Sequence, residues 1–151
     1  MMTMTEKYKI LGKYIKDMSS ETPDIETYIF VKDNISKYQL GIDINSKALK
    51  NKMIEINTLL KFEDKVGSEK KSYFEINFST IIRVDDQVKE KKDLERIILC
   101  DVQIAIYPDL EKSLLDLLHN SGYIFDGTSH NIIFSKSFLS LISSFTCITV
   151  V

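Results

Sequence analysis

The chain has 151 residues, of which 44% are hydrophobic and 28% charged, and its net charge at pH 7 is −2. This length suits one domain, and the composition is that of a globular protein rather than a disordered or collagenous one. Of the 20 basic residues only Arg83 and Arg96 are arginine, the preferred partner of phosphate and guanine, so a nucleic-acid binder is not expected.

Neither end of the chain resembles a targeting or membrane segment. The N-terminal sequence MMTMTEKYKI lacks an apolar run followed by a small-residue cleavage site. The C-terminal LSLISSFTCITVV is apolar but falls short of the roughly 18 residues that a membrane span needs. We therefore expect a cytoplasmic protein that does not insert stably into a membrane.

The first part of the chain predicts one strand and one connection. Residues Tyr8 to Ser19 are rich in Ile and Tyr, which is typical of a strand. Pro23 then interrupts the pattern. The apolar residues of Asp24 to Gln39 follow no clean period, so this segment is interpreted as an ordered connection.

Two further strands have much clearer signals. Apolar side chains alternate with polar ones from Met53 to Phe62 and from Tyr73 to Val84, as in strands that are buried on one face. The charged, Gly67-containing segment between them indicates a hairpin, so the two strands are predicted to be antiparallel neighbours. Gly41 to Asn45 is expected to begin the first of them, with a bulge or bend near residues 46–51.

The pattern then changes to helical spacing. Leu94 to Leu118 predicts an amphipathic helix. A break or kink is expected at Tyr107–Pro108, because proline removes a backbone donor and clashes with the preceding turn. Residues 119–122 should end it, and Ile132 to Ile142 predicts a short final helix. Strands followed by helices indicate an α+β fold with an antiparallel sheet.

No catalytic or metal-binding motif emerges from the chain. It contains no glycine-rich phosphate loop, GxSxG or HExxH sequence, and Cys100 and Cys147 form no CxxC pair. His119 and His130 fall at predicted helix-end or loop positions. The sequence therefore predicts a binding protein rather than an enzyme, with no cofactor and no metal site.

The predicted helix carries more apolar surface than we expect one small sheet to cover. Ile97, Ile98, Ile104 and Ile106 give it a wide apolar arc. Self-association would bury this excess, and the segment Asp24 to Gln39 could equally cover it. Periodicity leaves both interpretations open.

Several fragments, in order, resemble the SecB family of protein-export chaperones. They are Tyr14-Ile-Lys-Asp-Met-Ser-Ser-Glu-Thr-Pro23, Gly41-Ile-Asp-Ile-Asn45, the strand 54–62, Ser72-Tyr-Phe-Glu-Ile-Asn-Phe78, Cys100 with the Pro108-containing helix, and Ile132-Ile-Phe134. The resemblance runs from about Tyr8 to Leu141. It suggests a SecB-like domain over residues 1–142, followed by a short apolar tail over residues 143–151.

This resemblance implies a four-stranded antiparallel sheet with helices packed on one face, assembled as a homotetramer that is a dimer of dimers. Such proteins bind unfolded preproteins, keep them competent for translocation and pass them to the SecA motor, without hydrolysing anything themselves. The subunit interface is then expected to include Phe74, Ile76, Phe78, Ile97, Ile98, Cys100 and Ile104.

The resemblance also implies two binding sites. Contact with SecA falls on Asp17, Glu21, Tyr73 and Glu75, and strand parity places Tyr73 and Glu75 on the polar face, opposite Phe74 and Ile76. A client groove would be lined by apolar and aromatic side chains, which adapt to many sequences. The candidates are Tyr28, Ile29, Phe30, Val31, Tyr38, Phe134, Phe138 and Leu141.

Two alternatives to general export remain open at this point. A SecB-like chaperone can be dedicated to a narrow client, such as the antitoxin of a toxin–antitoxin pair. An α+β domain with a small-ligand pocket under the segment Asp24 to Gln39 is the third possibility. The C-terminus also departs from the family pattern, since no acidic residue follows Asp126, so contact with SecA or zinc through the tail is not expected.

Overall fold

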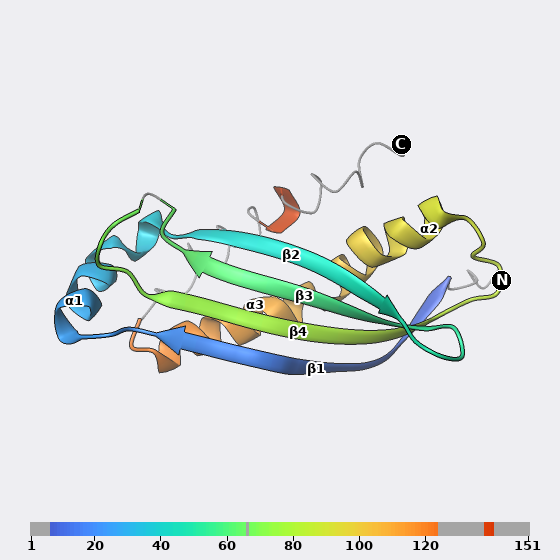
Figure 1. Cartoon of the computed structure of the whole chain (residues 1–151), viewed down its shortest axis with the longest axis horizontal. Coiled ribbons are helices and arrows are strands. Elements are labelled where there is room, and N and C mark those ends of the chain that lie inside the picture. Colours follow the sequence, from blue (N-terminus) through green and yellow to red (C-terminus); the bar gives the residue numbers. More distant parts are fainter. Residues whose placement is uncertain (1–6, 66, 124–137, 141–151) are drawn as a thin grey trace.

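A computed structural model describes residues 7–65, 67–123 and 138–140 of the chain. Four strands form one sheet: β1 (Tyr8–Glu21), β2 (Gln39–Ala48), β3 (Met53–Glu63) and β4 (Tyr73–Val84). Their order is β1-β4-β3-β2 and every neighbouring pair is antiparallel. The long helix α3 (Val102–Asn120) runs along one face of the sheet (Figure 1). The predicted α+β class is therefore confirmed.

The two strands with the clearest alternation form as predicted. β3 and β4 pair in a hairpin that sets Leu60 opposite Ile76 and Phe62 opposite Phe74. These four side chains are buried, whereas Tyr73 on the other face is exposed. Alternation specified the register here because a slip of one residue would turn every apolar side chain outward.

The prediction for Gly41 to Asn45 was wrong about where one strand ends and the next begins. These residues belong to a separate strand, β2, which pairs with β3 along its whole length. The bend expected near residues 46–51 is a tight turn in which Asn51 and Lys52 both have φ of 62°. Met53 N–H donates to the Lys50 carbonyl at 3.3 Å across it. Because this turn contains no glycine, it lacks the strongest short-range signal of a hairpin.

Replacing Lys52 with Gly is expected to raise the free energy of unfolding by about 1 kcal/mol, because glycine adopts a positive φ without the Cβ clash. The ion pair of Lys52 with Asp86 would be lost, but both side chains are mostly exposed, so its contribution is small. Lys50→Gly is the matched control and should not stabilise, because Lys50 is outside the left-handed region. Denaturant titration measures both variants.

The ordered connection expected over Asp24 to Gln39 is largely helical. It contains the helix α1 (Ile25–Asn34) and a 3₁₀ turn (Ile35–Lys37), which cross one end of the sheet (Figure 1). Asp24 caps α1, since its Oδ1 accepts the Thr27 N–H at 2.7 Å. Hydrogen bonds from the side chain and from the backbone of Thr27 lower the pKa of the Asp24 carboxyl. Exposed apolar residues mask the helical period, because they do not lie on the buried face of α1.

Of the break or kink expected at Tyr107–Pro108, the break is absent, and an irregularity lies earlier. α2 (Lys91–Arg96) passes through a π-helical segment (Ile97–Asp101) into α3, which continues through Pro108. Gln103, fully buried, donates from Nε2 to the Ile98 carbonyl at 3.1 Å in the π-helical segment. The carbonyl that Pro108 leaves unpaired belongs to Ile104, whose residue is 55% exposed, so water can hydrate it.

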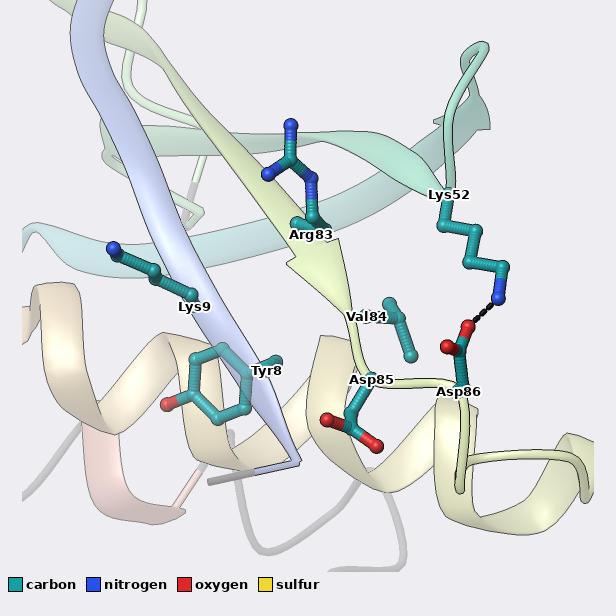
Figure 2. A pocket seen from close by; sticks show the side chains of 7 residues that line it. All are labelled: Tyr8, Lys9, Lys52, Arg83, Val84, Asp85 and Asp86. Atoms are coloured by element: carbon teal, nitrogen blue, oxygen red, sulfur yellow. Dashed lines mark ion pairs between the residues drawn. The ribbon is translucent and has the colours of Figure 1, made fainter. Parts of the chain in front are cut away.

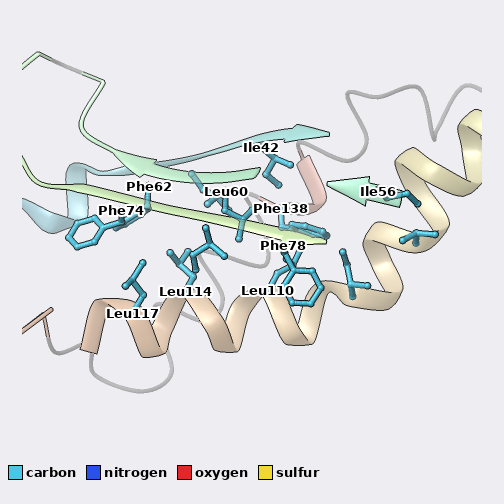
Figure 3. Close-up of a cluster of buried hydrophobic side chains, with 14 of the residues drawn as sticks. Ile42, Ile56, Leu60, Phe62, Phe74, Phe78, Leu110, Leu114, Leu117 and Phe138 are labelled. Carbon is cyan, nitrogen blue, oxygen red and sulfur yellow. The ribbon is translucent and has the colours of Figure 1, made fainter. Parts of the chain in front are cut away.

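The core fills the space between the sheet and α3. Phe62, Phe74 and Phe78 from the sheet face the leucines of α3, as Figure 3 shows. The predicted end of the long helix is confirmed: α3 stops at Asn120, and Gly122 takes a φ of 93° while its N–H donates to the His119 carbonyl. The fold therefore leaves the opposite face of the sheet, called the outer face below, uncovered by α3.

Candidate binding surfaces

The four residues predicted to contact SecA come together on the outer face. Residues directly opposite in an antiparallel pair share a face, and Glu21 stands opposite Tyr73 while Ser19 stands opposite Glu75. Glu75 thus lies diagonally between Asp17 and Glu21, a spacing of about 7–8 Å. Asp17, Glu21 and Tyr73 are exposed and Glu75 is half-buried. We call these four residues the acidic surface.

Of the lysines near the acidic surface, Lys16 and Lys71 have side-chain partners, and Lys61 stands directly opposite Glu75 in the pairing of β3 with β4. Lys16 precedes Asp17, but its Nζ is 2.9 Å from Oε1 of Glu55. The hydrogen bond from Lys16 lowers the pKa of the Glu55 carboxyl, and the same bond raises the pKa of Lys16. Lys71 Nζ lies 5.8 Å from the ring centroid of Tyr73. The carboxylates of Asp17 and Glu21 form no salt bridge within the described part of the chain.

A second surface is the apolar side of α1. Ile25, Ile29 and Phe30 are 67%, 54% and 38% exposed. Ile25 and Ile29 are four residues apart, so they stand on the same side of the helix, with Phe30 beside them. We call these three residues the α1 ridge. Ile29 and Phe30 were predicted from the sequence as groove residues, but Ile25 was not. Its spacing of four from Ile29 indicates a shared side only once the segment is known to be helical.

α1 packs against residues at the end of the sheet, and these contacts hold the α1 ridge in place. Val31 is fully buried, and Tyr28 packs against Tyr123 with ring centroids 5.3 Å apart. The Tyr28 hydroxyl donates to the Gly122 carbonyl at 2.8 Å. A Cβ at residue 122 would come within 3.0 Å of the Tyr28 ring, so this close approach requires glycine.

The other predicted groove residues separate into two groups. Val31, Tyr38 and Phe138 are buried in the core, and Tyr38 accepts the Ser72 N–H at 2.9 Å. Burial raises the pKa of the Tyr38 phenol. Phe134, Leu141 and the tail 143–151 lie outside the described residues.

The predicted interface residues are mostly part of the chain's own core. Ile104 alone among them is exposed, at 55%, on the helix α3. The other six, each no more than 9% exposed, are Phe74, Ile76, Phe78, Ile97, Ile98 and Cys100. A surface that sequence reasoning did not find is β1, an edge strand whose Leu11, Tyr14, Ile15 and Met18 are 41–47% exposed.

The described residues contain no group of three or more His, Cys, Asp or Glu side chains that could hold a metal ion. In the same part of the chain, no helix is both long and apolar enough to cross a membrane. What the structure offers is a set of surfaces: the acidic surface, the α1 ridge, Ile104 and the edge strand β1.

Comparison with known proteins gives these surfaces a context. The putative protein-export protein SecB of Pelagibacter ubique (strain HTCC1062) is 62% identical over 120 residues, covering 80% of this chain and 86% of that protein. The protein-export protein SecB of Methylocella silvestris is 21% identical over 111 residues, covering 74% and 68%.

Among solved structures, a similar fold occurs in the Mycobacterium tuberculosis SecB-like chaperone Rv1957, in complex with a ChAD peptide from the antitoxin HigA1. Its TM-score is 0.58 at 11% identity, with 82% of this chain and 88% of that chain covered, a likeness that concerns the fold. The model of the family described as preprotein translocase subunit SecB matches residues 2–125, and together with the 62% identical relative it shows that the chain belongs to the SecB family.

Proposed function

We propose that this protein acts in the cytoplasm as a holdase, which keeps preproteins unfolded and delivers them to the SecA motor. Membership of the SecB family supports a role as a chaperone for preprotein export. The observation that carries the proposal is the α1 ridge, three large apolar side chains held exposed on a firmly anchored helix. The proposed activity is binding, without a catalysed reaction.

Client binding by the α1 ridge follows from its chemistry. Unfolded chains expose apolar side chains that folded proteins hide, so a ridge of Ile and Phe favours the unfolded state. A ligand that binds only the unfolded state draws the folding equilibrium toward it. One ridge makes few contacts, but several ridges in an assembly add through effective concentration along one long client.

Delivery to SecA is assigned to the acidic surface. Three carboxylates around one exposed tyrosine suit a partner surface that carries lysine and arginine. The surface lies on the outer face, away from α3, so a partner could dock there without disturbing the core. This assignment concerns the four residues Asp17, Glu21, Tyr73 and Glu75.

Assembly into a tetramer is assigned to β1 and α3. The free edge of β1 offers unpaired backbone groups and four exposed apolar side chains, which a second copy could cover. Ile104 offers a separate apolar contact on α3. Two different contacts are what a dimer of dimers needs.

Replacing Ile25, Ile29 and Phe30 together with Ser is expected to weaken the binding of an unfolded preprotein by about tenfold or more, because the apolar area offered to the client is lost. Titration of a labelled, urea-diluted preprotein by fluorescence anisotropy measures the dissociation constant. Circular dichroism and light scattering verify that fold and assembly are kept.

The matched control replaces three polar residues of the same helix, Glu26, Lys32 and Asp33, with Ser. These side chains are also exposed, so the control removes three surface side chains without removing apolar area. It should bind the preprotein as the unmodified chain does. Equal loss of binding in the two variants would contradict the role of the α1 ridge.

A further inference from the structure

A second feature of the sheet lies at the end opposite the acidic surface. An open pocket of about 470 Å³ forms where β1 begins and β4 ends (Figure 2). The register runs from Glu21 opposite Tyr73 at one end to Tyr8 opposite Val84 at the other, so almost the whole strand separates the two places. The pocket is lined by Tyr8, Lys9, Lys52, Arg83, Val84, Asp85 and Asp86.

Two cations stand side by side at this pocket. Lys9 on β1 is directly opposite Arg83 on β4, and both side chains are exposed. Neither forms a salt bridge with any residue that the structure describes. Like charges directly opposite across two strands repel, so the pair would gain from an anion placed between them.

Neither carboxylate that lines the pocket forms an ion pair with Lys9 or Arg83. Asp86 forms an ion pair with Lys52, drawn as a dashed line in Figure 2. Asp85 accepts the Gln87 N–H at 2.9 Å, and Figure 2 shows its side chain on the helix side of the sheet, while Lys9 and Arg83 extend to the other side. The positive charge of Lys9 and Arg83 therefore remains available to a ligand.

An apolar pocket of about 380 Å³ adjoins this one and shares Lys52, Val84, Asp85 and Asp86 with it. The remainder of its lining is wholly apolar: Ala48, Leu49, Met53, Ile54, Val88 and Leu94. A ligand that fills both pockets must therefore carry negative charge beside an apolar group. A free inorganic anion meets the first requirement only.

We propose that these joined pockets bind an acidic peptide segment of a partner protein. An Asp or Glu carboxylate bridges the Lys9 ammonium and the Arg83 guanidinium, which can hold a carboxylate through two hydrogen bonds. An apolar side chain next to it in the peptide enters the adjoining pocket. This site is distinct from the acidic surface, which fits a basic partner, and it does not depend on the proposed holdase function.

The test measures the affinity of the full-length chain for a labelled ten-residue peptide made of glutamates around one leucine, by fluorescence anisotropy at low salt. The double variant Lys9→Gln and Arg83→Gln is expected to weaken binding at least tenfold. The control Lys32→Gln and Lys37→Gln removes two exposed cations at the α1 end and should change affinity less than twofold.

Three outcomes would overturn the proposal. Equal weakening in both double variants would show that only net charge matters. Unchanged affinity in the Lys9 and Arg83 variant would show that the peptide binds elsewhere or not at all. Displacement of the peptide by inorganic phosphate at equal concentration would assign the site to a small anion. Preprotein binding, measured separately, tests the holdase function, so the two failures are distinguishable.

Discussion

Reversing the charge of Asp17, Glu21 and Glu75 to Lys is expected to weaken binding to SecA by about 100-fold. Each exposed charge pair contributes about 0.5 kcal/mol, and each reversal replaces that attraction with a repulsion of similar size. Because the three residues lie diagonally around one point of the outer face, one partner surface would meet all of them. Surface plasmon resonance with immobilised SecA measures the change at constant ionic strength.

The control for this result changes net charge by the same amount at a distant place. Glu90, Glu95 and Asp116 are exposed and outside the acidic surface, and their reversal to Lys should leave SecA binding within about twofold. Preprotein binding should persist in both variants. An unmodified chain that holds preproteins without binding SecA would contradict delivery and favour the narrow-client role.

Truncating Phe74 to Ala is expected to lower the free energy of unfolding by about 3–5 kcal/mol, because the ring lies inside the core of the single chain. Phe74 is 1% exposed, and its ring centroid lies 5.4 Å from that of Tyr123 and 6.2 Å from that of Phe62. Denaturant unfolding at one fixed protomer concentration measures the loss, since the stability of an oligomer depends on concentration.

Ile104→Asp separates a role in the core from a role in assembly. The side chain of Ile104 is already exposed in the single chain, so a carboxylate there should barely affect the folding of the protomer. Placed in an apolar contact between copies, the same carboxylate should dissociate the tetramer, as measured by light scattering. A Phe74→Ala variant that yields folded protomers of undiminished stability would instead assign Phe74 to the interface.

The sequence correctly predicted the strands whose buried and exposed side chains alternate because one face packs against a neighbouring layer. Alternation in β3 and β4 reflects burial on a single face, and that face is determined by α3 packing against it. α1 lacks such a pattern, because Ile25, Ile29 and Phe30 stay exposed while Thr27 and Val31 are buried. The hydrophobic period identifies a helix only when its apolar side chains lie on the buried face. In α1 apolar side chains are also exposed, so the period does not reveal the helix.

The helix interruption shows a second limit of local reasoning. Proline at residue 108 predicted a break, yet the irregularity lies at Ile97–Asp101. Gln103 is fully buried there, hydrogen-bonded to Thr58 on β3 at 2.9 Å and to the Ile98 carbonyl. That arrangement requires Thr58, which lies 45 residues from Gln103 in the sequence. The sequence of the helix alone therefore does not predict it.

By itself, the sequence determined the α+β class, the strands β3 and β4, the end of α3 before Gly122 and the placement of Tyr73 and Glu75 on the face opposite Phe74 and Ile76. Each of these follows from chain-local spacing or from the conformational freedom of one residue. Only the tertiary structure decided that Asp17 and Glu21 meet Glu75, and that Lys9 meets Arg83, because strand pairing joins segments more than 50 residues apart. Likewise, only packing against α3 decided that Phe74, Ile76 and Phe78 lie in the chain's own core while Ile104 stays exposed, since burial depends on the area that distant elements cover.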